Sequence, residues 1–354
     1  MDNKKILEKT KMKIAISNAK KENIVMKKDK LGKFIGIAAC VVISTTGVAF
    51  ATNEIIKKFG DNSSDGVQIA IDNQYYAEPN TEYKDANGIS TSIDSFLIDD
   101  YNFDININLK FEDKNILNEM LENDGRIDIM DLKIVNENNE KIFATRELET
   151  EEMLSQYKTE QEAMENYDSY MGAYSNTAKK INDNEVKLQL TATGSEEEFP
   201  ASKKLKISFN KIRNKHFVSD EEIIKIYQGK WEFEVDVPEK MSKSSIVKYK
   251  LGSISEENYK LESAKVSNTA FKIKISSCEG LAFKEEQYIE NEKGKKFYSA
   301  ARSDGDGGLI ISDDGTQIFY NTFNLTNFDA TDKLTVHLFK ESGEEVIIKL
   351  VVQF

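Results

Sequence analysis

Apolar and polar residues alternate along several short stretches of the chain. The clearest is 102–111 (NFDININLKF), in which every second residue is apolar and the residues between are polar or charged. Successive side chains of a strand point to opposite faces, so this period of two predicts a strand with one face in a core and the other toward solvent. The same pattern predicts four further strands, at 126–135, 185–193, 205–212 and 231–237.

A second strand-rich region follows a Lys- and Ser-rich linker at 239–245 and repeats the first in order. The matching pairs are FKIKIS (271–276) with FDININ (103–108), NEKGKKF (291–297) with NNEKIF (138–143), LTVHLF (334–339) with LKISF (205–209), and the terminal IIKLVVQF with WEFEVDV. A preserved order of matches indicates a duplication. We therefore expect a mainly β protein with two tandem immunoglobulin-like β-sandwich domains, at 91–238 and 246–354.

One segment of the first domain breaks the alternation. Within 147–171, Leu154, Tyr157, Met164 and Met171 recur at helical spacing, and Gly172 follows the last of them. Acidic residues in the first turn and a glycine after the end are typical of a helix. The pattern predicts a helical insertion, which either packs on one sheet or binds a partner.

Charge is distributed unevenly along the chain. Residues 1–33 hold 11 lysines and four acidic residues, a net charge of +7, and the chain as a whole carries −13, so the remainder carries −20. The uncharged run 34–52 that follows would span about 28 Å as a helix, close to the hydrocarbon thickness of a bilayer. Cations before an apolar run keep that end in the cytoplasm. We therefore expect a basic cytoplasmic arm at 1–33, a single transmembrane helix at 34–53, a polar tether at 54–90, and extracytoplasmic β domains.

Three fates of the apolar run follow from its residues. The run stays as a membrane anchor, or it is cleaved after Ala51, which ends an A-x-A site, or a lipid is attached to Cys40. We expect the anchor to be retained, because 33 residues are long for the basic region of a signal peptide. Most of the apolar run also follows Cys40, whereas a lipoprotein signal has its apolar region before the cysteine.

Patterns that carry catalysis or bind metals are sparse. His216 and His337 have no metal-ligand spacing, and we expect His337, in mid-strand, to be a hydrogen-bonded surface histidine. Cys278 has no local His or Asn to activate it. Asp304 and Asp306 have the spacing of calcium ligands, but no Glu closes the loop, and two glycine-rich turns explain it equally well. We expect no enzymatic activity, no catalytic or metal site and no cofactor.

The order of four sequence blocks resembles a known family. The Lys-rich KMKIAISNAKKEN, the apolar GIAACVVISTTGVAFA, IDSFLIDDYNFDININLKF and GKWEFEVDVP resemble uncharacterised Gram-positive single-pass membrane proteins with paired domains of unknown function. That family is described as negative effectors of extracytoplasmic-function sigma factors. The resemblance implies an anti-sigma-like regulator with an outside sensor and a cytoplasmic arm that restrains a sigma factor.

Two functional hypotheses follow. In the first, the arm binds a sigma factor and the outer domains receive a signal from an envelope or protein ligand. In the alternative, the protein is a cell-envelope binding or adhesion module with no regulatory role, and the arm serves only to orient the anchor. The charge of −20 on the outer part disfavours nucleic acid as a partner in either case.

Overall fold

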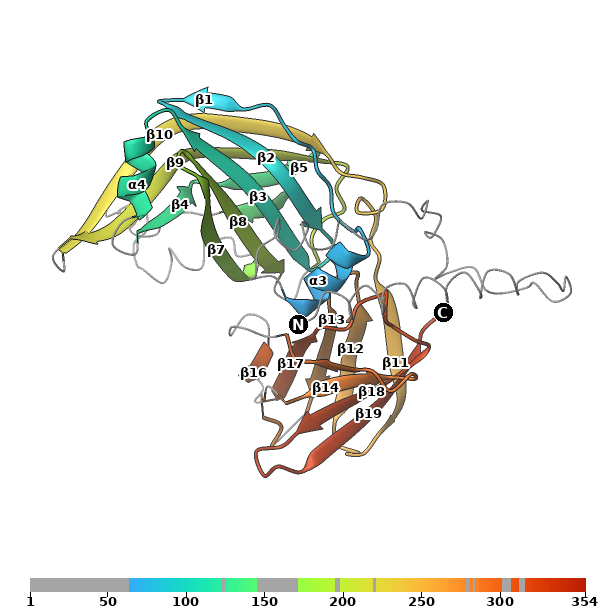
Figure 1. The fold of residues 1–354 in the computed structure, drawn as a ribbon. Helices are drawn as coiled ribbons and strands as arrows, with labels where there is room; N and C mark the ends of the chain where they lie inside the picture. Colours follow the sequence, from blue (N-terminus) through green and yellow to red (C-terminus); the bar gives the residue numbers. More distant parts are fainter. Residues whose placement is uncertain are drawn as a thin grey trace, which may run out of the picture. The chain divides into compact units, whose positions relative to one another are not determined.

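The computed structural model describes residues 64–121, 125–144, 171–194, 198–218, 221–277, 280–282, 284, 286–300, 307–311 and 316–354. All of them belong to one compact part of the chain, 50–354. The described part is mainly β, with several antiparallel sheets and two helices (Figure 1). It contains two separate hydrophobic cores, one built from residues 67–241 and the other from residues 249–352.

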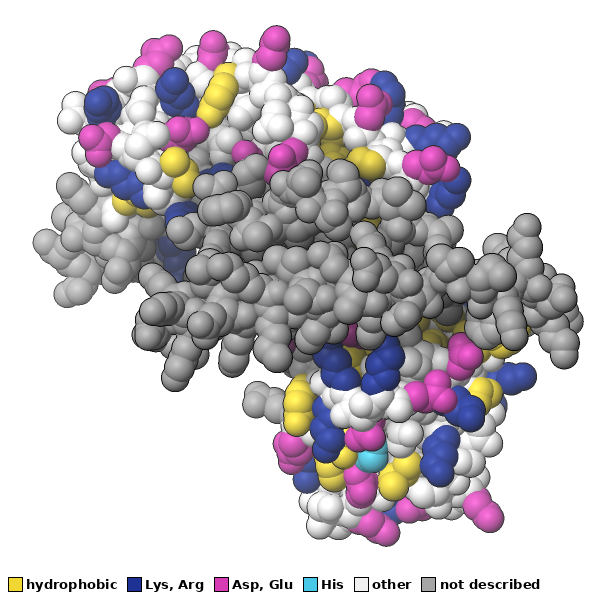
Figure 2. All heavy atoms as spheres, turned by 45° about the vertical axis from the view of Figure 1, so that its right-hand side comes forward, with side chains coloured by type: hydrophobic (Ala, Val, Ile, Leu, Met, Phe, Trp, Pro, Cys, Tyr) yellow, Lys and Arg dark blue, Asp and Glu magenta, His cyan; other side chains and the backbone are white. Residues whose placement is uncertain are grey.

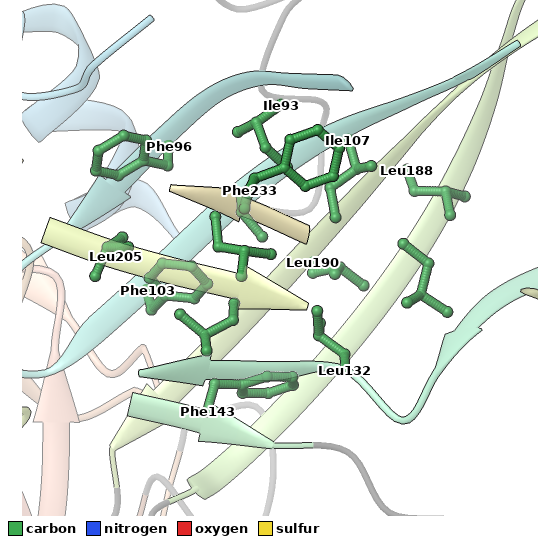
Figure 3. Packing of buried hydrophobic residues seen from close by; sticks show 14 of the residues in the cluster. Ile93, Phe96, Phe103, Ile107, Leu132, Phe143, Leu188, Leu190, Leu205 and Phe233 are labelled. Atoms are coloured by element: carbon green, nitrogen blue, oxygen red, sulfur yellow. The ribbon is translucent and has the colours of Figure 1, made fainter. Parts of the chain in front are cut away.

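The first core lies between two sheets. Its helices and strands are α3 (Asp65–Asp72), β1 (Lys84–Ala86), β2 (Ile89–Ile98), β3 (Asn102–Phe111), α4 (Lys114–Leu121), β4 (Arg126–Met130), β5 (Lys133–Asn136), β6 (Lys141–Ala144), β7 (Met171–Asn182), β8 (Glu185–Gly194), β9 (Lys204–Val218) and β10 (Glu221–Asp236). One sheet has the order β1-β2-β3-β8-β7 and the other β10-β9-β5-β6, with β4 also paired to β9. Phe103 and Leu188 of the first sheet and Leu205 and Phe233 of the second contribute to this core, which gives a β-sandwich-like arrangement (Figure 3).

The second core is enclosed by one nine-stranded sheet. Its strands are β11 (Val247–Ile254), β12 (Lys260–Val266), β13 (Phe271–Ser276), β14 (Tyr288–Asn291), β15 (Lys296–Tyr298), β16 (Gly307–Ile311), β17 (Gln317–Phe323), β18 (Lys333–Phe339) and β19 (Glu345–Val352). Their order is β15-β14-β18-β19-β11-β12-β13-β17-β16. Strand β11 pairs with β12 at its first two residues and with β19 from Tyr249 onward, so it joins two halves that contribute to the same core.

The two β units repeat one strand order. In the first, β2-β3-β8-β7 and β10-β9-β5-β6 are neighbours, and in the second, β12-β13-β17-β16 and β19-β18-β14-β15 take the corresponding places. The sequence matches of β3 with β13, β9 with β18 and β10 with β19 fall on corresponding strands. A common strand plan therefore accompanies the common sequence order.

The hairpin turns of the two units also correspond, with a shift of two residues from the sequence match. Asn136 Oδ1 accepts hydrogen bonds from the backbone N–H groups of Asn138 and Glu140, both at 2.9 Å. Asn291 Oδ1 accepts the same pair from Lys293 and Lys295, at 3.0 and 3.1 Å. Asn291 thus matches Asn136 and not Asn138, because the side chain that closes each turn must lie at its first position.

The strand predictions are confirmed in place and corrected in extent. Residues 102–111 form β3 as predicted, but 126–135 forms two strands, because Asp131 has a left-handed backbone with φ of 53°. Strands β9 and β10 extend well beyond the predicted 205–212 and 231–237 and pair up to Val218 and Glu221. Ile224 and Ile226 of this extension are about half exposed, so no core imposes an alternating pattern there. The predicted helical insertion overlaps the described residues only at Met171, which lies in β7.

The polar face of β3, predicted to face solvent, is solvent-exposed only at one end, at Lys110, with Asn108 half-buried, and the rest of it is buried. Asp104 and Asn106 are fully buried. Thr191 on β8 donates to Asp104 Oδ1 at 2.7 Å, and Asn106 donates to Ser95 Oγ on β2 at 2.9 Å. Polar side chains on the neighbouring strands therefore supply hydrogen bonds that solvent would otherwise provide.

The predicted tether at 54–90 is wrong for its described part. Ser64 caps α3 by accepting from the N–H of Val67, and Val67 and Ile71 lie in the first core. Gly66 approaches the second unit so closely that a Cβ there would lie 2.0 Å from the carbonyl oxygen of Thr269. Three apolar residues at helical spacing (Val67, Ala70 and Ile71) lie on the buried face of α3 and override the polar composition around them.

Buried polar side chains connect the two units. Thr269 Oγ1 donates to Asp99 Oδ2 and accepts from Asn102 Nδ2, both at 2.6 Å. Ser245 donates its backbone N–H and its hydroxyl to Asp100 Oδ2 at 3.1 and 3.3 Å. Burial, the largest effect, raises the pKa of Asp100, with a contribution from the charge of Asp99.

Several predicted features lie outside the described residues. These are the arm 1–33, the transmembrane helix 34–53, Cys40, Ala51, the insertion from 147 to 170, Cys278, Asp304 and Asp306. Within the described ranges, no helix is long and apolar enough to cross a membrane.

Candidate functional site

The outer face of the β10-β9-β5 sheet carries two rows of side chains. The period of two directs Ile134, Ile207 and Phe233 into the core and leaves their neighbours outside. The strand register then sets Glu232 beside Ser208 and Ser208 beside Lys133. In the second row, Glu234 lies beside Lys206 and Lys206 beside Val135.

These rows form the floor of a hollow of about 440 Å³, named here the lysine hollow. Its lining residues are Lys84, Lys133, Val135, Lys206, Ile207, Ser208, Glu232, Phe233 and Glu234. All of them lie on the β10-β9-β5-β6 sheet except Lys84. Lys84 lies on β1, the edge strand of the facing sheet. The volume lies within the range of small-molecule sites, roughly 300–1,000 Å³.

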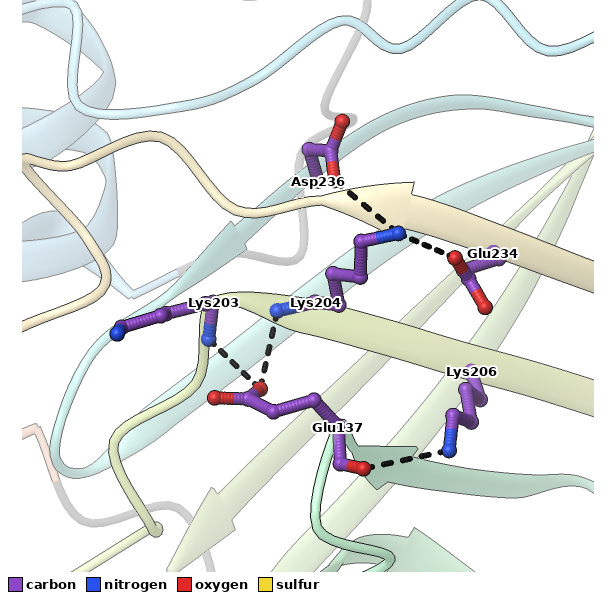
Figure 4. A network of polar contacts seen from close by, with 6 residues as sticks. All are labelled: Glu137, Lys203, Lys204, Lys206, Glu234 and Asp236. Atoms are coloured by element: carbon purple, nitrogen blue, oxygen red, sulfur yellow. Dashed lines mark hydrogen bonds and ion pairs between the residues drawn. The ribbon is translucent and has the colours of Figure 1, made fainter.

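Both glutamates of the hollow have cationic partners that do not line it. Glu234 bonds to Lys204, which also lies 3.7 Å from Asp236 (Figure 4). Glu232 lies 3.0 Å from Lys230. The hydrogen bond from Lys204 and its charge lower the pKa of Glu234. Both carboxylates therefore have an ammonium partner outside the hollow.

Glu137, in the β5–β6 turn, organises one end of the hollow. Its carboxylate accepts hydrogen bonds from the backbone N–H groups of Lys203 and Lys204 at 2.9 and 3.1 Å. A bond from its own backbone N–H and the bond from Lys203 hold its pKa below the usual range. The Lys206 ammonium donates to the Glu137 carbonyl at 3.3 Å and to Asn139 Oδ1 at 3.0 Å (Figure 4). The turn thus fixes the direction of Lys206.

Three lysines of the hollow form no ion pair among the described residues, although Lys206 lies beside Glu234 and its charge contributes to the lowered pKa of that carboxyl group. Lys206 bonds only to the neutral oxygens of the turn, Lys133 is exposed, and the Lys84 ammonium lies 5.8 Å from the centre of the Phe233 ring. On the face shown in Figure 2, lysines and carboxylates are interspersed. The hollow contains three ammonium groups that form no ion pair among the described residues.

The second unit presents the corresponding face with different chemistry. Tyr288, His337 and Ile347 form one row across β14, β18 and β19, in the places of Lys133, Ser208 and Glu232. The rings of Tyr288 and His337 stack at 4.3 Å, and His337 Nδ1 lies 2.7 Å from Glu345 Oε1. His337 is thus the hydrogen-bonded strand histidine that the sequence predicted.

The other candidate residues are not brought together. His216 lies in β9, and Cys278, Asp304 and Asp306 lie outside the described residues. No group of three or more His, Cys, Asp or Glu residues in the described part could hold a metal ion. The lysine hollow was missed because its residues come from four strands; the signal available was the opposed charge of LKIS and WEFEVDV, which pair in β9 and β10.

Comparison with known proteins finds a likeness at the level of structure. No family model matches the chain, and no curated protein matches it. A solved structure, described as the crystal structure of the conserved domain protein from Bacillus anthracis, is 16% identical and aligns with a TM-score of 0.40. The alignment covers 79% of this chain and 91% of that one.

Proposed function

We propose that the chain is a single-pass membrane protein that regulates an extracytoplasmic-function sigma factor, as an anti-sigma-like negative effector. In this proposal residues 34–53 cross the cell membrane of a Gram-positive bacterium and the arm 1–33 binds the sigma factor in the cytoplasm. The β units lie outside and receive the signal. The charge step from +7 to −20 across the apolar run supports this topology.

The observation that carries the sensing role is the lysine hollow. It has the volume of a small-molecule site, its floor is a hydrogen-bonded sheet, and its lysines form no ion pair among the described residues. Its only lining hydroxyl, Ser208, has no histidine or other base among the lining residues, so we assign it to binding and assign the protein no catalytic step.

We also infer the finer architecture that the sequence predicts. The β units are two tandem immunoglobulin-like sandwiches, at 91–238 and 246–354, and the first carries a helical insertion at about 147–171. The repeated antiparallel strand order supports the duplication, and residues 145–170 separate β6 from β7, where the second unit has the shorter segment 299–306 between β15 and β16.

A second candidate is a cell-envelope binding module with no regulatory role. The aromatic row of the second unit favours it, since Tyr298 is about half exposed and lies across the strand pair from Tyr288. Two outward faces with different chemistry suit a protein that holds two features of an envelope polymer or protein.

A crosslinking pulldown separates these candidates. Residues 1–53 on the membrane should recover a sigma factor, and an arm with the same lysines and a scrambled order should not. If the native arm recovers no sigma factor even after crosslinking, the regulatory proposal fails. If the scrambled arm also preserves function in cells, the binding module is the better account.

A further inference from the structure

We propose that the lysine hollow binds a phosphate ester, either a free sugar phosphate or a phosphodiester unit of an envelope polymer. The proposal concerns the ligand of the hollow and stands whether or not the arm binds a sigma factor. It rests on four observations: the charge of the hollow, the placement of its ammonium groups, the nature of its floor, and its contrast with the second unit.

The charge of the hollow favours an anion. Lys84, Lys133 and Lys206 line the hollow and form no ion pair among the described residues, whereas Glu232 and Glu234 pair with Lys230 and Lys204, and Lys206 acts on Glu234 only through its charge. Residues 34–354 carry a net charge of −20, so a group of lysines at one place has the sign opposite to the net charge of this part of the chain. A ligand with negative charge would gain from all three ammonium groups.

The type and placement of the cations favour phosphate over a planar carboxylate. Lysine binds compact anions as a point charge, whereas the flat fork of arginine matches planar carboxylates, and the hollow contains lysine only. An ammonium has three donors, and Lys206 uses two on Glu137 and Asn139, so one remains for a ligand oxygen. Lys84 lies on β1 and Lys133 on β5, strands of different sheets, so their ammonium groups can bind different oxygens of a tetrahedral anion.

The floor of the hollow suits the carbon skeleton of an ester. Val135 lines it and remains slightly exposed, at 6%. Ser208 adds a hydroxyl group to the lining. A cavity of about 440 Å³ is larger than inorganic phosphate needs, so the proposal specifies an ester and not the free ion.

The second unit shows that the fold does not require these lysines. The strand register puts Tyr288 in the place of Lys133 and Thr335 in the place of Lys206. The same sheet plan is therefore built with aromatic and neutral side chains at these positions. The cationic lining is a property of the first unit and not of the repeated architecture.

Calorimetry on the full chain in detergent tests the proposal, with glucose 6-phosphate, glucose, citrate and a glycerol phosphate oligomer as probes. The variant carries Lys84→Gln and Lys133→Gln, and the matched control carries Lys248→Gln and Lys250→Gln, two exposed lysines of β11 with the same change in net charge. We expect the affinity for glucose 6-phosphate to fall at least tenfold in the variant and to change less than twofold in the control. Glu232→Gln should raise the affinity for glucose 6-phosphate.

The outcomes are distinct. Equal loss in the control would mean non-specific charge attraction, equal binding of citrate would mean that phosphate is not the recognised group, and binding of glucose alone would mean that the lysines are not used. Each of these, and the absence of phosphate ester binding, overturns the proposal. An oligomer that binds at least tenfold more tightly per phosphate than the monomer identifies the envelope polymer as the source, and otherwise a free sugar phosphate is the source. None of these results depends on the sigma-factor pulldown.

Discussion

Replacing Gly229 with alanine tests the packing of the first core at one point. A Cβ at Gly229 would lie 2.3 Å from Cη2 of Trp231, and 2.6 and 2.7 Å from Cζ2 and Cζ3. Trp231 is fully buried, stacks on Phe209 at 5.1 Å between ring centres, and donates its Nε1–H to the Ile89 carbonyl at 3.3 Å. The indole therefore cannot move aside without losing contacts on its other side.

The expected cost follows from the overlap. Overpacking a well-packed core costs about 1–3 kcal/mol. At 2–4 °C per kcal/mol this lowers the melting temperature by roughly 2–12 °C. Gly229 does not have a left-handed backbone, so alanine brings no φ strain. It also reduces the entropy of the unfolded chain, which by itself stabilises by about 0.4–1 kcal/mol.

The control is the same substitution in a Trp231→Phe background. The indole atoms that meet the new Cβ are then removed, so Gly229→Ala should become neutral or slightly stabilising, and the coupling between the two sites should be at least about 1 kcal/mol. Denaturant unfolding followed by circular dichroism measures all four proteins. Trp231 is the only tryptophan, so its fluorescence also follows the first core separately from the second. An equal effect of Gly229→Ala in both backgrounds would refute the assigned contact.

Three further predictions concern stability. Ile71→Ala in α3 should destabilise the first unit by about 2–5 kcal/mol. Asp72→Ala, on the exposed side of the same helix, should cost only a few tenths of a kcal/mol. Equal effects of the two substitutions would support the tether interpretation. Asn136→Ala and Asn291→Ala should each cost about 1–3 kcal/mol through unpaired turn N–H groups, and Asn138→Ala should cost little, as urea midpoints would show. Burial raises the pKa of Asp100, so the folded state takes up its proton more readily than the unfolded state. Wild-type stability should therefore gain relative to Asp100→Asn as the pH falls from 7 to about 4, and a relative loss would contradict the burial effect.

Alternation along the chain predicted the strands with the clearest apolar faces, among them β3, β8, β9 and β10. It located β3 to the residue and predicted the repeat of β3, β9 and β10 as β13, β18 and β19. This is possible because the period of two is a local property of an extended chain with one face in a core. At Ile224, which is about half exposed, apolar residues no longer indicate a buried face. The length of the β9–β10 hairpin was therefore underestimated.

Only the tertiary structure decided which polar residues are buried and which side chains meet. The alternation predicts that Asp104 of β3 faces solvent, yet Asp104 is buried and its Oδ1 accepts a hydrogen bond from Thr191 on β8. Lys84 and Phe233 line one hollow although nearly 150 positions separate them. Strand pairing brings such residues together through contacts between distant segments, and the spacing of residues along one strand carries no information about its neighbours.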